Sequence, residues 1–235
     1  MYVSNKLKMS FWGRIIYDIT RLATWVIGKL MFRVSVENPG NVPKEGGLLI
    51  VSNHVSHLDP PLTGSFLPRR CGYHMAKMEL FGIGILRVYM LSIGSIMVNR
   101  GKGKQALLEA VQYLNDGQVV FIFPEGTRSK SGRLMEGKSG AVMMAIRTGC
   151  TILPSAIIGS QHAMRKGSIF IRPVKIRIRY GEPYRIEYDG DPERIPKEVM
   201  LREMARMMQK IEDLLPEDMR PDPADKERWY GVQAG

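Results

Sequence analysis

The stretch Leu48-Leu-Ile-Val-Ser-Asn-His-Val-Ser-His-Leu-Asp59 gives the first indication of the fold. It opens with a short, continuous apolar run, which is typical of a strand buried on both faces of a parallel sheet. A polar loop follows directly and begins at Asn53. Since α/β proteins bind ligands at the carboxyl ends of parallel strands, we expect this loop to lie at a ligand-binding edge.

Similar apolar runs follow toward the C-terminus and alternate with helical patterns. We expect further strands at residues 94–98, 119–123 and 152–158. The helical period predicts helices over 104–115, with Gly117 as its C-terminal cap, and over 138–148, ending at Gly149. Strands separated by helices predict a single α/β domain with a mostly parallel sheet flanked by helices.

The last third of the chain carries a different strand pattern at residues 174–180. Apolar and basic residues alternate strictly there, so one face of the strand is apolar and the other is basic. A Met-rich helix of mixed charge is expected at 196–215. From Pro216 onward Pro and charged residues dominate, which predicts a loosely ordered C-terminal tail over 216–235.

The N-terminal segment, residues 1–36, is expected to hold an amphipathic helix that associates with a membrane surface. Apolar residues from Trp12 onward follow the helical period, and charged residues such as Arg14 and Arg21 lie mostly on the other side. These charges interrupt a stretch that would need about 20 mostly apolar residues to span a membrane. The indole rings of Trp12 and Trp25 favour the boundary between water and lipid. The alternative is a helix that only packs on the domain.

Length and charge limit the architecture and the partner. A chain of 235 residues fits one large domain with small additions, and we assign that domain to residues 37–215. Lys and Arg number 34 against 23 Asp and Glu, a net charge of +11. Such an excess indicates an anionic partner: nucleic acid, a membrane surface or a phosphorylated substrate. The two cysteines, Cys71 and Cys150, are too few for a disulfide framework and indicate a reducing compartment.

The polar loop after the first strand contains a candidate general base. His54 and Asp59 are five residues apart, and Pro60 and Pro61 follow. A turn into a helix would bring the carboxylate back to the imidazole, where it would accept the Nδ1 proton and leave Nε2 free as a base. The alternative is that Asp59 caps a helix and His54 is an ordinary polar loop residue.

A second polar motif, Phe123-Pro-Glu-Gly-Thr-Arg-Ser129, follows another apolar strand. Gly126 permits unusual backbone angles, so that amide groups can point toward an anion. Arg128 supplies a guanidinium fork that matches a phosphate group. Taken alone, the motif is also compatible with an ordinary polar turn.

Together these motifs resemble the signature of the glycerolipid acyltransferase family, the 1-acylglycerol-3-phosphate O-acyltransferases. The first and third blocks of that family are similar to Asn53-His54-x-Ser56-x-x-Asp59 and to Phe123-Pro-Glu-Gly-Thr-Arg128. The second is similar to Gly94-Ser-Ile-Met-Val-Asn-Arg100, with Met97 and Val98 in place of Phe and Ile. The fourth is similar to Ile152-Leu-Pro154-Ser-Ala, although Ser155 stands where a branched apolar residue is usual. The blocks occur in the family's order over about residues 48–159.

The resemblance implies an enzyme that moves a fatty acyl group from acyl-CoA or acyl-carrier protein to lysophosphatidic acid, giving phosphatidic acid. It implies His54 as the general base, Asp59 as its orienting partner, and direct attack by the acceptor without an acyl-enzyme. It implies no metal and no cofactor besides the acyl thioester. By position it assigns the acceptor phosphate to Arg100, Glu125, Gly126, Thr127, Arg128 and Lys77, and it places Pro154 in the block linked with the acyl donor.

Several points stay open. Glycerol 3-phosphate or another lysophospholipid would use the same phosphate-binding residues. The apolar run at residues 80–98, in which Arg87 is the one charged residue after Leu80, is compatible with an acyl groove or with core packing. Because acceptor and product are lipids, we expect a peripheral or monotopic protein on the cytoplasmic face of the cell membrane.

Other functional classes fit the sequence less well. Residues 132–139 match the nucleotide-binding pattern Gly-x4-Gly-Lys-Ser, but the nearest expected strand ends well upstream, so a nucleotide hydrolase is a weak alternative. Lys138 is instead expected to begin a helix near the turn at 123–129. Residues 101–106 resemble a dinucleotide fingerprint that two lysines disturb. The basic strand has no interleaved aromatic residues for nucleic acid, and no His and Cys cluster indicates a metal site.

Overall fold

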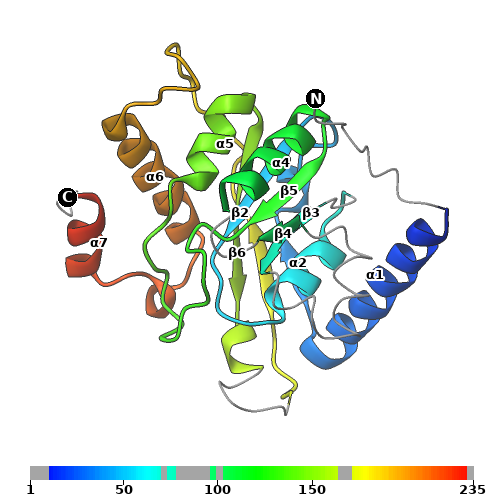
Figure 1. Ribbon diagram of the computed structural model, residues 1–235. Coiled ribbons are helices and arrows are strands. Elements are labelled where there is room, and N and C mark those ends of the chain that lie inside the picture. Colours follow the sequence, from blue (N-terminus) through cyan, green and yellow to red (C-terminus); the bar gives the residue numbers. More distant parts are fainter. Residues whose placement is uncertain (1–10, 70–72, 78–95, 99–102, 164–170, 232–235) are drawn as a thin grey trace.

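The computed structural model describes residues 11–69, 73–77, 96–98, 103–163 and 171–231, which form a β-sheet with helices on both faces (Figure 1). Within these residues the sheet has seven strands in the order β1-β7-β6-β2-β5-β3-β4. The strands are β1 (Ser35–Glu37), β2 (Leu48–Ser52), β3 (Tyr73–Lys77), β4 (Ile96–Val98), β5 (Val119–Ile122), β6 (Thr151–Ile158) and β7 (Arg177–Tyr180).

The sheet is mixed, with a parallel centre. From β6 through β2, β5 and β3 to β4, every neighbouring pair of strands is parallel. At the other edge β7 pairs antiparallel with β6, and β1 pairs parallel with β7. The predicted α/β fold with a largely parallel sheet is therefore confirmed. The strands β1 and β3 were not predicted, because β1 has only three residues and β3 has no continuous apolar run.

Side-chain alternation along the buried strands builds one apolar core on each face of the sheet. On one face, Leu48 and Ile50 of β2 pack in a cluster with residues of α2 (Asp59–Phe66) and the end of α1 (Phe11–Phe32). On the other face, Leu49 and Val51 pack in a cluster with residues of α4 (Gly103–Asn115), α5 (Gly140–Thr148) and α6 (Lys197–Glu212). All five β2 side chains are fully buried, and the first four form the continuous apolar run in the sequence.

The helices begin and end close to where the helical period predicts. Gly117 and Gly149 follow α4 and α5 with φ of +74° and +59°, which are left-handed values that glycine adopts without steric cost. Helix α5 starts two residues later than predicted. The main-chain N–H of Lys138 bonds to the carbonyl oxygen of Pro124 at 2.9 Å, which holds this residue outside the helix.

Helix α1 packs on the domain through a narrow face and leaves its apolar face exposed. Tyr17 and Phe32 are buried, and a Cβ at Gly28 would lie 2.5 Å from Cε2 of Phe66 on α2. On the opposite side, Ile19, Leu22 and Leu30 are 63%, 61% and 77% exposed. The predicted helix is therefore present, and it also packs on the domain, whereas its association with a membrane stays a prediction. Within the described residues no helix is long and apolar enough to cross a membrane.

The C-terminal tail is not loosely ordered as expected. After α6 the chain forms a 3-10 turn, η4 (Glu217–Met219), and a helix, α7 (Pro223–Tyr230). Met219 is 2% exposed and joins the core beneath α6, and the Asp222 side chain caps α7 by accepting the N–H of Ala224. The prediction was based on the Pro and charge content of the tail. It did not consider that Met219 could be buried or that Asp222 could cap a helix.

Candidate active site

The polar loop of the first motif starts where β2 ends and is tied to the neighbouring strand β6 by Asn53. Its side-chain Oδ1 accepts the N–H of Ile157 at 2.8 Å, and its Nδ2 donates to the carbonyl oxygen of the same residue at 3.0 Å. Asn53 is 1% exposed and thus continues the pairing of β2 with β6 by side-chain bonds. This fixes the start of the loop at the carboxyl edge of the parallel strands.

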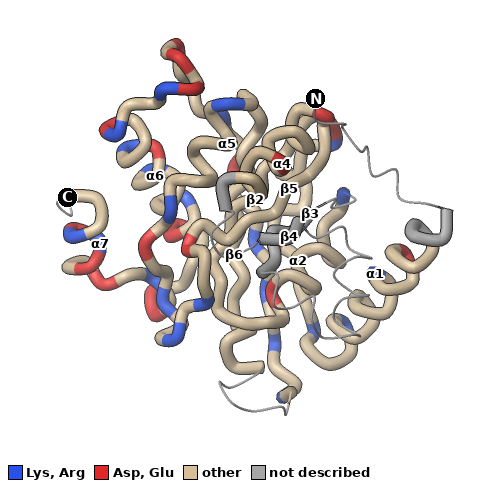
Figure 2. Tube along the Cα trace, viewed as in Figure 1, with Lys and Arg blue, Asp and Glu red and all other residues tan. Residues whose placement is uncertain are grey.

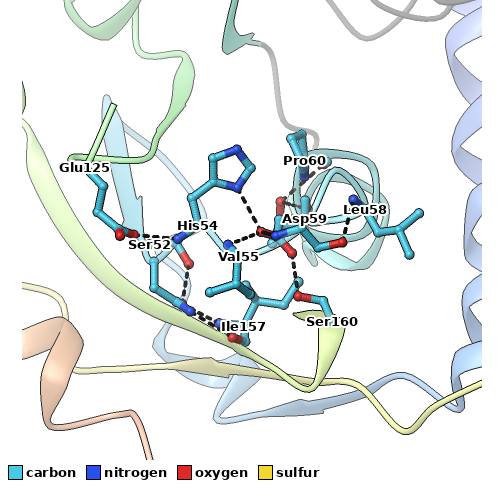
Figure 3. Close-up of polar contacts among 12 residues, drawn as sticks. Ser52, His54, Val55, Leu58, Asp59, Pro60, Glu125, Ile157 and Ser160 are labelled. Atoms are coloured by element: carbon cyan, nitrogen blue, oxygen red, sulfur yellow. Dashed lines mark hydrogen bonds and ion pairs between the residues drawn. The ribbon is translucent and has the colours of Figure 1, made fainter. Parts of the chain in front are cut away.

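His54 and Asp59 form the pair that their spacing predicts (Figure 3). Nδ1 of His54 lies 2.8 Å from Oδ2 of Asp59. Because a carboxylate only accepts hydrogen bonds, Nδ1 is assigned the proton and Nε2 carries the lone pair. Nε2 has no hydrogen-bond partner within the described part of the chain, and the His54 side chain is 16% exposed. One imidazole nitrogen is therefore hydrogen-bonded to Asp59, and the other is available to accept a proton.

The Asp59 carboxylate is fully enclosed by donors. Besides Nδ1 of His54, Oδ2 accepts the main-chain N–H groups of Val55 and Ser56 at 2.8 and 2.7 Å. Oδ1 accepts the hydroxyl of Ser160 at 2.6 Å, at the start of the 3-10 turn η3 (Ser160–His162) that follows β6. Asp59 is 0% exposed, so these four bonds replace its water shell and fix its position.

The second motif lies against the first. The Phe123 ring stacks on the His54 imidazole with centroids 4.1 Å apart and an angle of 17° between the planes. The N–H of Ser129 donates to the carbonyl oxygen of His54 at 2.8 Å. The residues 53–59 and 123–129 therefore form one unit, in which the imidazole plane is set by Asp59 on its edge and by Phe123 on its face.

Glu125 contacts this unit on its buried side and not on the side that faces solvent. Its Oε1 accepts the N–H of His54 at 2.6 Å, and its Oε2 accepts the N–H of Met135 at 3.1 Å. Burial raises the pKa of Glu125 to about 8, although the two backbone bonds oppose the shift. The side chain is 2% exposed, so it shapes the site by joining two loops.

Gly126, Thr127 and Arg128 form the exposed part of the second motif. The N–H of Gly126 donates to the carbonyl oxygen of Phe123 at 3.0 Å, and Gly126 has a φ of +67°, so the turn is tight and favours glycine. Burial lowers the pKa of His57, and the charges of Arg128 and His54 lower it further. This places the Arg128 guanidinium within electrostatic reach of the loop that carries His54.

The loop that joins β5 to α5 is rich in basic residues (Figure 2). It holds Arg128, Lys130, Arg133 and Lys138, all exposed, against the acids Glu125 and Glu136. The same loop contains the predicted nucleotide-binding pattern at 132–139. That pattern requires a strand, loop and helix in direct succession, yet β5 ends at Ile122, ten residues before Gly132 (132 − 122). The structure thus gives no support to the nucleotide-binding alternative.

Three residues of the predicted site are not brought together with His54 by the described contacts. Pro154 is buried within β6, paired in register with Val51, and accepts the N–H of Gly181 at its carbonyl oxygen. Lys77 is the last residue of β3, and its side chain lies outside the described part of the structure. Arg100 lies outside the described residues, as do Cys71 and most of the apolar run at 80–98.

The structure adds two residues that the sequence analysis missed, Ser160 and Phe123 as a stacking partner. Ser160 follows the strand β6 and Gly159, whose φ is +96°. A hydroxyl placed just after a buried strand, at the same edge as His54, is the signal that could have identified it. In the described part of the chain, no cluster of His, Cys, Asp and Glu side chains is suited to a metal ion.

The family model and the relatives that match this chain all point to one family, the acyltransferases. A family model described as Acyltransferase matches residues 33–158, more than half of the chain. A 1-acyl-sn-glycerol-3-phosphate acyltransferase of Borreliella burgdorferi is 29% identical over 154 residues, which are 64% of this chain and 60% of that protein. A protein of the same name from Bacillus subtilis is 28% identical over 201 residues, which are 84% of this chain and 96% of that protein.

The fold is shared with a solved relative. The crystal structure of the 1-acyl-sn-glycerophosphate (LPA) acyltransferase PlsC from Thermotoga maritima superposes with a TM-score of 0.66 at 29% identity, covering 86% of this chain and 79% of that one. The chain spans about three fifths of the length of several curated relatives, such as the B. burgdorferi protein (60%) and a probable 1-acyl-sn-glycerol-3-phosphate acyltransferase of Mycoplasma pneumoniae (64%).

Proposed function

Because this chain belongs to the acyltransferase family, we propose that it moves a fatty acyl group from a thioester to the free hydroxyl of 1-acylglycerol 3-phosphate, giving phosphatidic acid. The observation that carries this proposal is the His54–Asp59 pair, with Nε2 of His54 unbonded in the described structure and the turn at Gly126 beside it. The names of the relatives from B. burgdorferi and B. subtilis support the acceptor.

In the proposed reaction, Nε2 of His54 takes the proton of the acceptor hydroxyl while its oxygen attacks the thioester carbonyl carbon. Asp59, bonded to Nδ1, stabilises the imidazolium that forms. The tetrahedral intermediate collapses by breaking the carbon–sulfur bond, and the imidazolium returns its proton to the thiolate. A positioned base of this kind contributes about 10²–10⁴ in rate. The acceptor is itself the nucleophile, so no acyl-enzyme is required.

The negative charge of the intermediate needs hydrogen-bond donors nearby. Among the described residues, the main-chain N–H groups of Thr127 and Arg128 donate to no internal acceptor, and they follow the tight turn at Gly126. Amides fixed in this way cost little reorganisation when charge develops on the carbonyl oxygen. We assign them as candidate oxyanion donors.

The acceptor phosphate is proposed to bind Arg128, together with Lys77 and Arg100. Arg128 is exposed at the carboxyl edge beside His57. Lys77 ends β3, and β4, which pairs with β3 in parallel, ends at Val98, two residues before Arg100 in the sequence. Lys77 thus ends, and Arg100 follows in the sequence, a strand that runs in the same direction as β2, whose carboxyl end leads to His54. Glycerol 3-phosphate and other lysophospholipids would use the same cations and remain alternative acceptors.

The enzyme is proposed to act at a membrane surface, on the cytoplasmic face of the membrane. Apolar side chains of α1 such as Ile19, Leu22 and Leu30 are exposed, and Trp25 is 42% exposed although its ring stacks on Phe66. Burying such a face in the boundary of a bilayer is favourable, and basic residues add attraction to anionic lipids. The acyl donor is proposed to be acyl-CoA or acyl-carrier protein.

One assay tests this function. Purified protein is incubated with lysophosphatidic acid and palmitoyl-CoA, and phosphatidic acid and free thiol are quantified together. Equal formation of both products is expected, and ATP hydrolysis is expected to stay at background. Intact-mass spectrometry of the protein with donor alone should show no acyl adduct. A stoichiometric adduct that transfers to added acceptor would reject direct attack, and no product in the assay would reject the function.

A further inference from the structure

The segment that precedes α5 is fixed to three different parts of the molecule by main-chain hydrogen bonds. It has no regular secondary structure, lies beside the turn at Gly126 and carries Lys138 at its end. The bonds are from Leu134 N to Met219 O (2.8 Å), Met135 N to Glu125 Oε2 (3.1 Å), Gly137 N to Tyr230 Oη (2.8 Å) and Lys138 N to Pro124 O (2.9 Å). The position of Lys138 is therefore set by its surroundings and not by the helix that follows.

The Lys138 side chain lies along the Gly126 backbone. A Cβ added at Gly126 would lie 3.0 Å from Nζ and 3.2 Å from both Cδ and Cε of Lys138. Position 126 favours glycine through its φ of +67°, and the end of the lysine side chain lies next to it. The ammonium group is thereby brought against the tight turn that leads into Arg128.

Lys138 has no acidic partner within the described part of the chain, and neither has Arg128. Three partly buried cations are paired with acids: Arg147 with Glu193, Arg179 with Glu37, and Lys226 with Glu212. Glu125, which lies beneath the turn, directs its two oxygens to main-chain N–H groups instead. Two cations without acidic partners at one turn, with amide groups beside them, are suited to an anionic ligand.

We propose that Lys138 is a further phosphate-binding residue of the acceptor site, acting with Arg128 across the turn at Gly126. The proposal rests on the proposed function, which supplies a phosphate monoester. The guanidinium of Arg128 provides a planar fork, and the ammonium of Lys138 provides a compact charge with three donors. The two groups would bind the same phosphate while the free hydroxyl of the acceptor faces Nε2 of His54.

The C-terminal helix has a part in this arrangement. The Tyr230 hydroxyl of α7 accepts the N–H of Gly137, the residue before Lys138. Gly137 also packs tightly against α6, since a Cβ there would lie 2.6 Å from Sδ of Met204. Both helices lie outside residues 33–158, which the acyltransferase family model matches. The position of Lys138 thus depends on a part of the chain that the family signature does not include.

The experiment compares the full chain with three variants. Lys138→Met keeps the stem that packs on Gly126 and removes the charge, Lys130→Met removes a charge from the same loop, and Tyr230→Phe removes only the hydroxyl. Binding of lysophosphatidic acid is measured by titration calorimetry, and KM and kcat are measured with lysophosphatidic acid and with uncharged monoacylglycerol. Lys138→Met should bind the phosphorylated acceptor about tenfold or more weakly. Its kcat and its KM for monoacylglycerol should stay near wild type, which shows that it is folded.

Tyr230→Phe should shift acceptor binding in the same direction by a smaller factor, and Lys130→Met should leave it unchanged. Equal acceptor binding by Lys138→Met and the wild type overturns the proposal, as does an equal loss in Lys130→Met, which would indicate surface charge alone. A wild type that binds lysophosphatidic acid without acylating it rejects the proposed function, yet the comparison of binding still decides the role of Lys138. A wild type that does not bind it rejects both.

Discussion

Oε1 of Glu125 lies 2.6 Å from the main-chain nitrogen of His54, so the residue before the turn at Gly126 holds the backbone of the candidate base. The other oxygen of the same carboxyl group holds Met135, in the segment that leads to Lys138. One buried side chain therefore sets the distance between the base and the basic turn. These two bonds fit a residue that shapes the pocket, and its assignment to the phosphate site stays a prediction.

Glu125 should make the stability of the protein depend on pH. Burial raises its pKa from an ordinary 4.5 to about 8, so the folded protein holds this proton more tightly than the unfolded chain. The contribution is fully present below pH 4.5, and it is lost as pH rises through about 8. The slope from this group reaches at most about 1.4 kcal/mol per pH unit. Urea unfolding of the wild type and of Glu125→Gln between pH 5 and 8 measures it.

The Gln variant should show a flatter fall in the free energy of unfolding over that range. It should also be less stable at low pH by about 1–3 kcal/mol, because its amide has one oxygen for two N–H donors. Parallel pH profiles for the two proteins would show that Glu125 does not titrate as assigned.

Asp59→Asn should reduce turnover severely while the fold is kept. The amide is similar in size to the carboxylate, but it cannot balance an imidazolium, and its NH₂ group would face N–H donors that now bond to oxygen. We expect kcat to fall by about 10²–10⁴, the range of a lost general base. Ser160→Ala is the matched control, because it removes one bond to Asp59 and leaves the pair with His54 intact. A kcat for Asp59→Asn within a few-fold of wild type would show that the carboxylate is not needed.

The sequence was sufficient to predict the parallel centre of the sheet and the position of each motif directly after a buried strand. Buried strands such as β2 read as apolar runs, and motifs that follow parallel strands must meet at one edge. The pairing of His54 with Asp59 could be stated because both residues lie in one short loop.

The remaining features depend on contacts between distant parts of the chain. Ser160 reaches Asp59 across 101 positions, and Tyr230 reaches Gly137 across 93. The place of Ser160 after a buried strand indicates the edge at which it lies but not its partner, and Tyr230 carries no local signal of Gly137. The order of the C-terminal tail was missed for the same reason, since the buried Met219 side chain packs in a core cluster with residues far away in the sequence, such as Leu134.

Arg128 should determine the preference for a phosphorylated acceptor. A charge-assisted bond of this kind contributes about 1.5–3 kcal/mol, so Arg128→Ala should raise the KM for lysophosphatidic acid by about tenfold or more. The KM of the acyl donor and the KM for monoacylglycerol should change little. Arg133→Ala is a suitable control, because that guanidinium is exposed in the same loop and bonds to the carbonyl oxygen of Arg220. An unchanged ratio of the two acceptor KM values would reject the assignment.

The exposed face of α1 should bind membranes. We expect the wild type to sediment with anionic vesicles and to be released in part by high salt, because both apolar burial and charge contribute. Replacing Ile19, Leu22 and Leu30 with Asn removes about 1.5–3 kcal/mol of apolar burial at each position, which should weaken binding by about 10²-fold or more. Leu201→Asn on α6 is the matched control, since Leu201 is 47% exposed in the wild type. Equal sedimentation of the triple variant and the wild type would place the membrane contact elsewhere.

The central claim is that His54 is the base for attack on the thioester. The most direct measurement is kcat of His54→Ala with lysophosphatidic acid and palmitoyl-CoA, both saturating, in a sample whose thermal unfolding matches the wild type. Because Nε2 is the atom that receives the proton, we predict a fall in kcat of about 10²-fold or more, with acceptor binding retained. A well-folded His54→Ala protein that turns over at a rate near the wild type would contradict the mechanism.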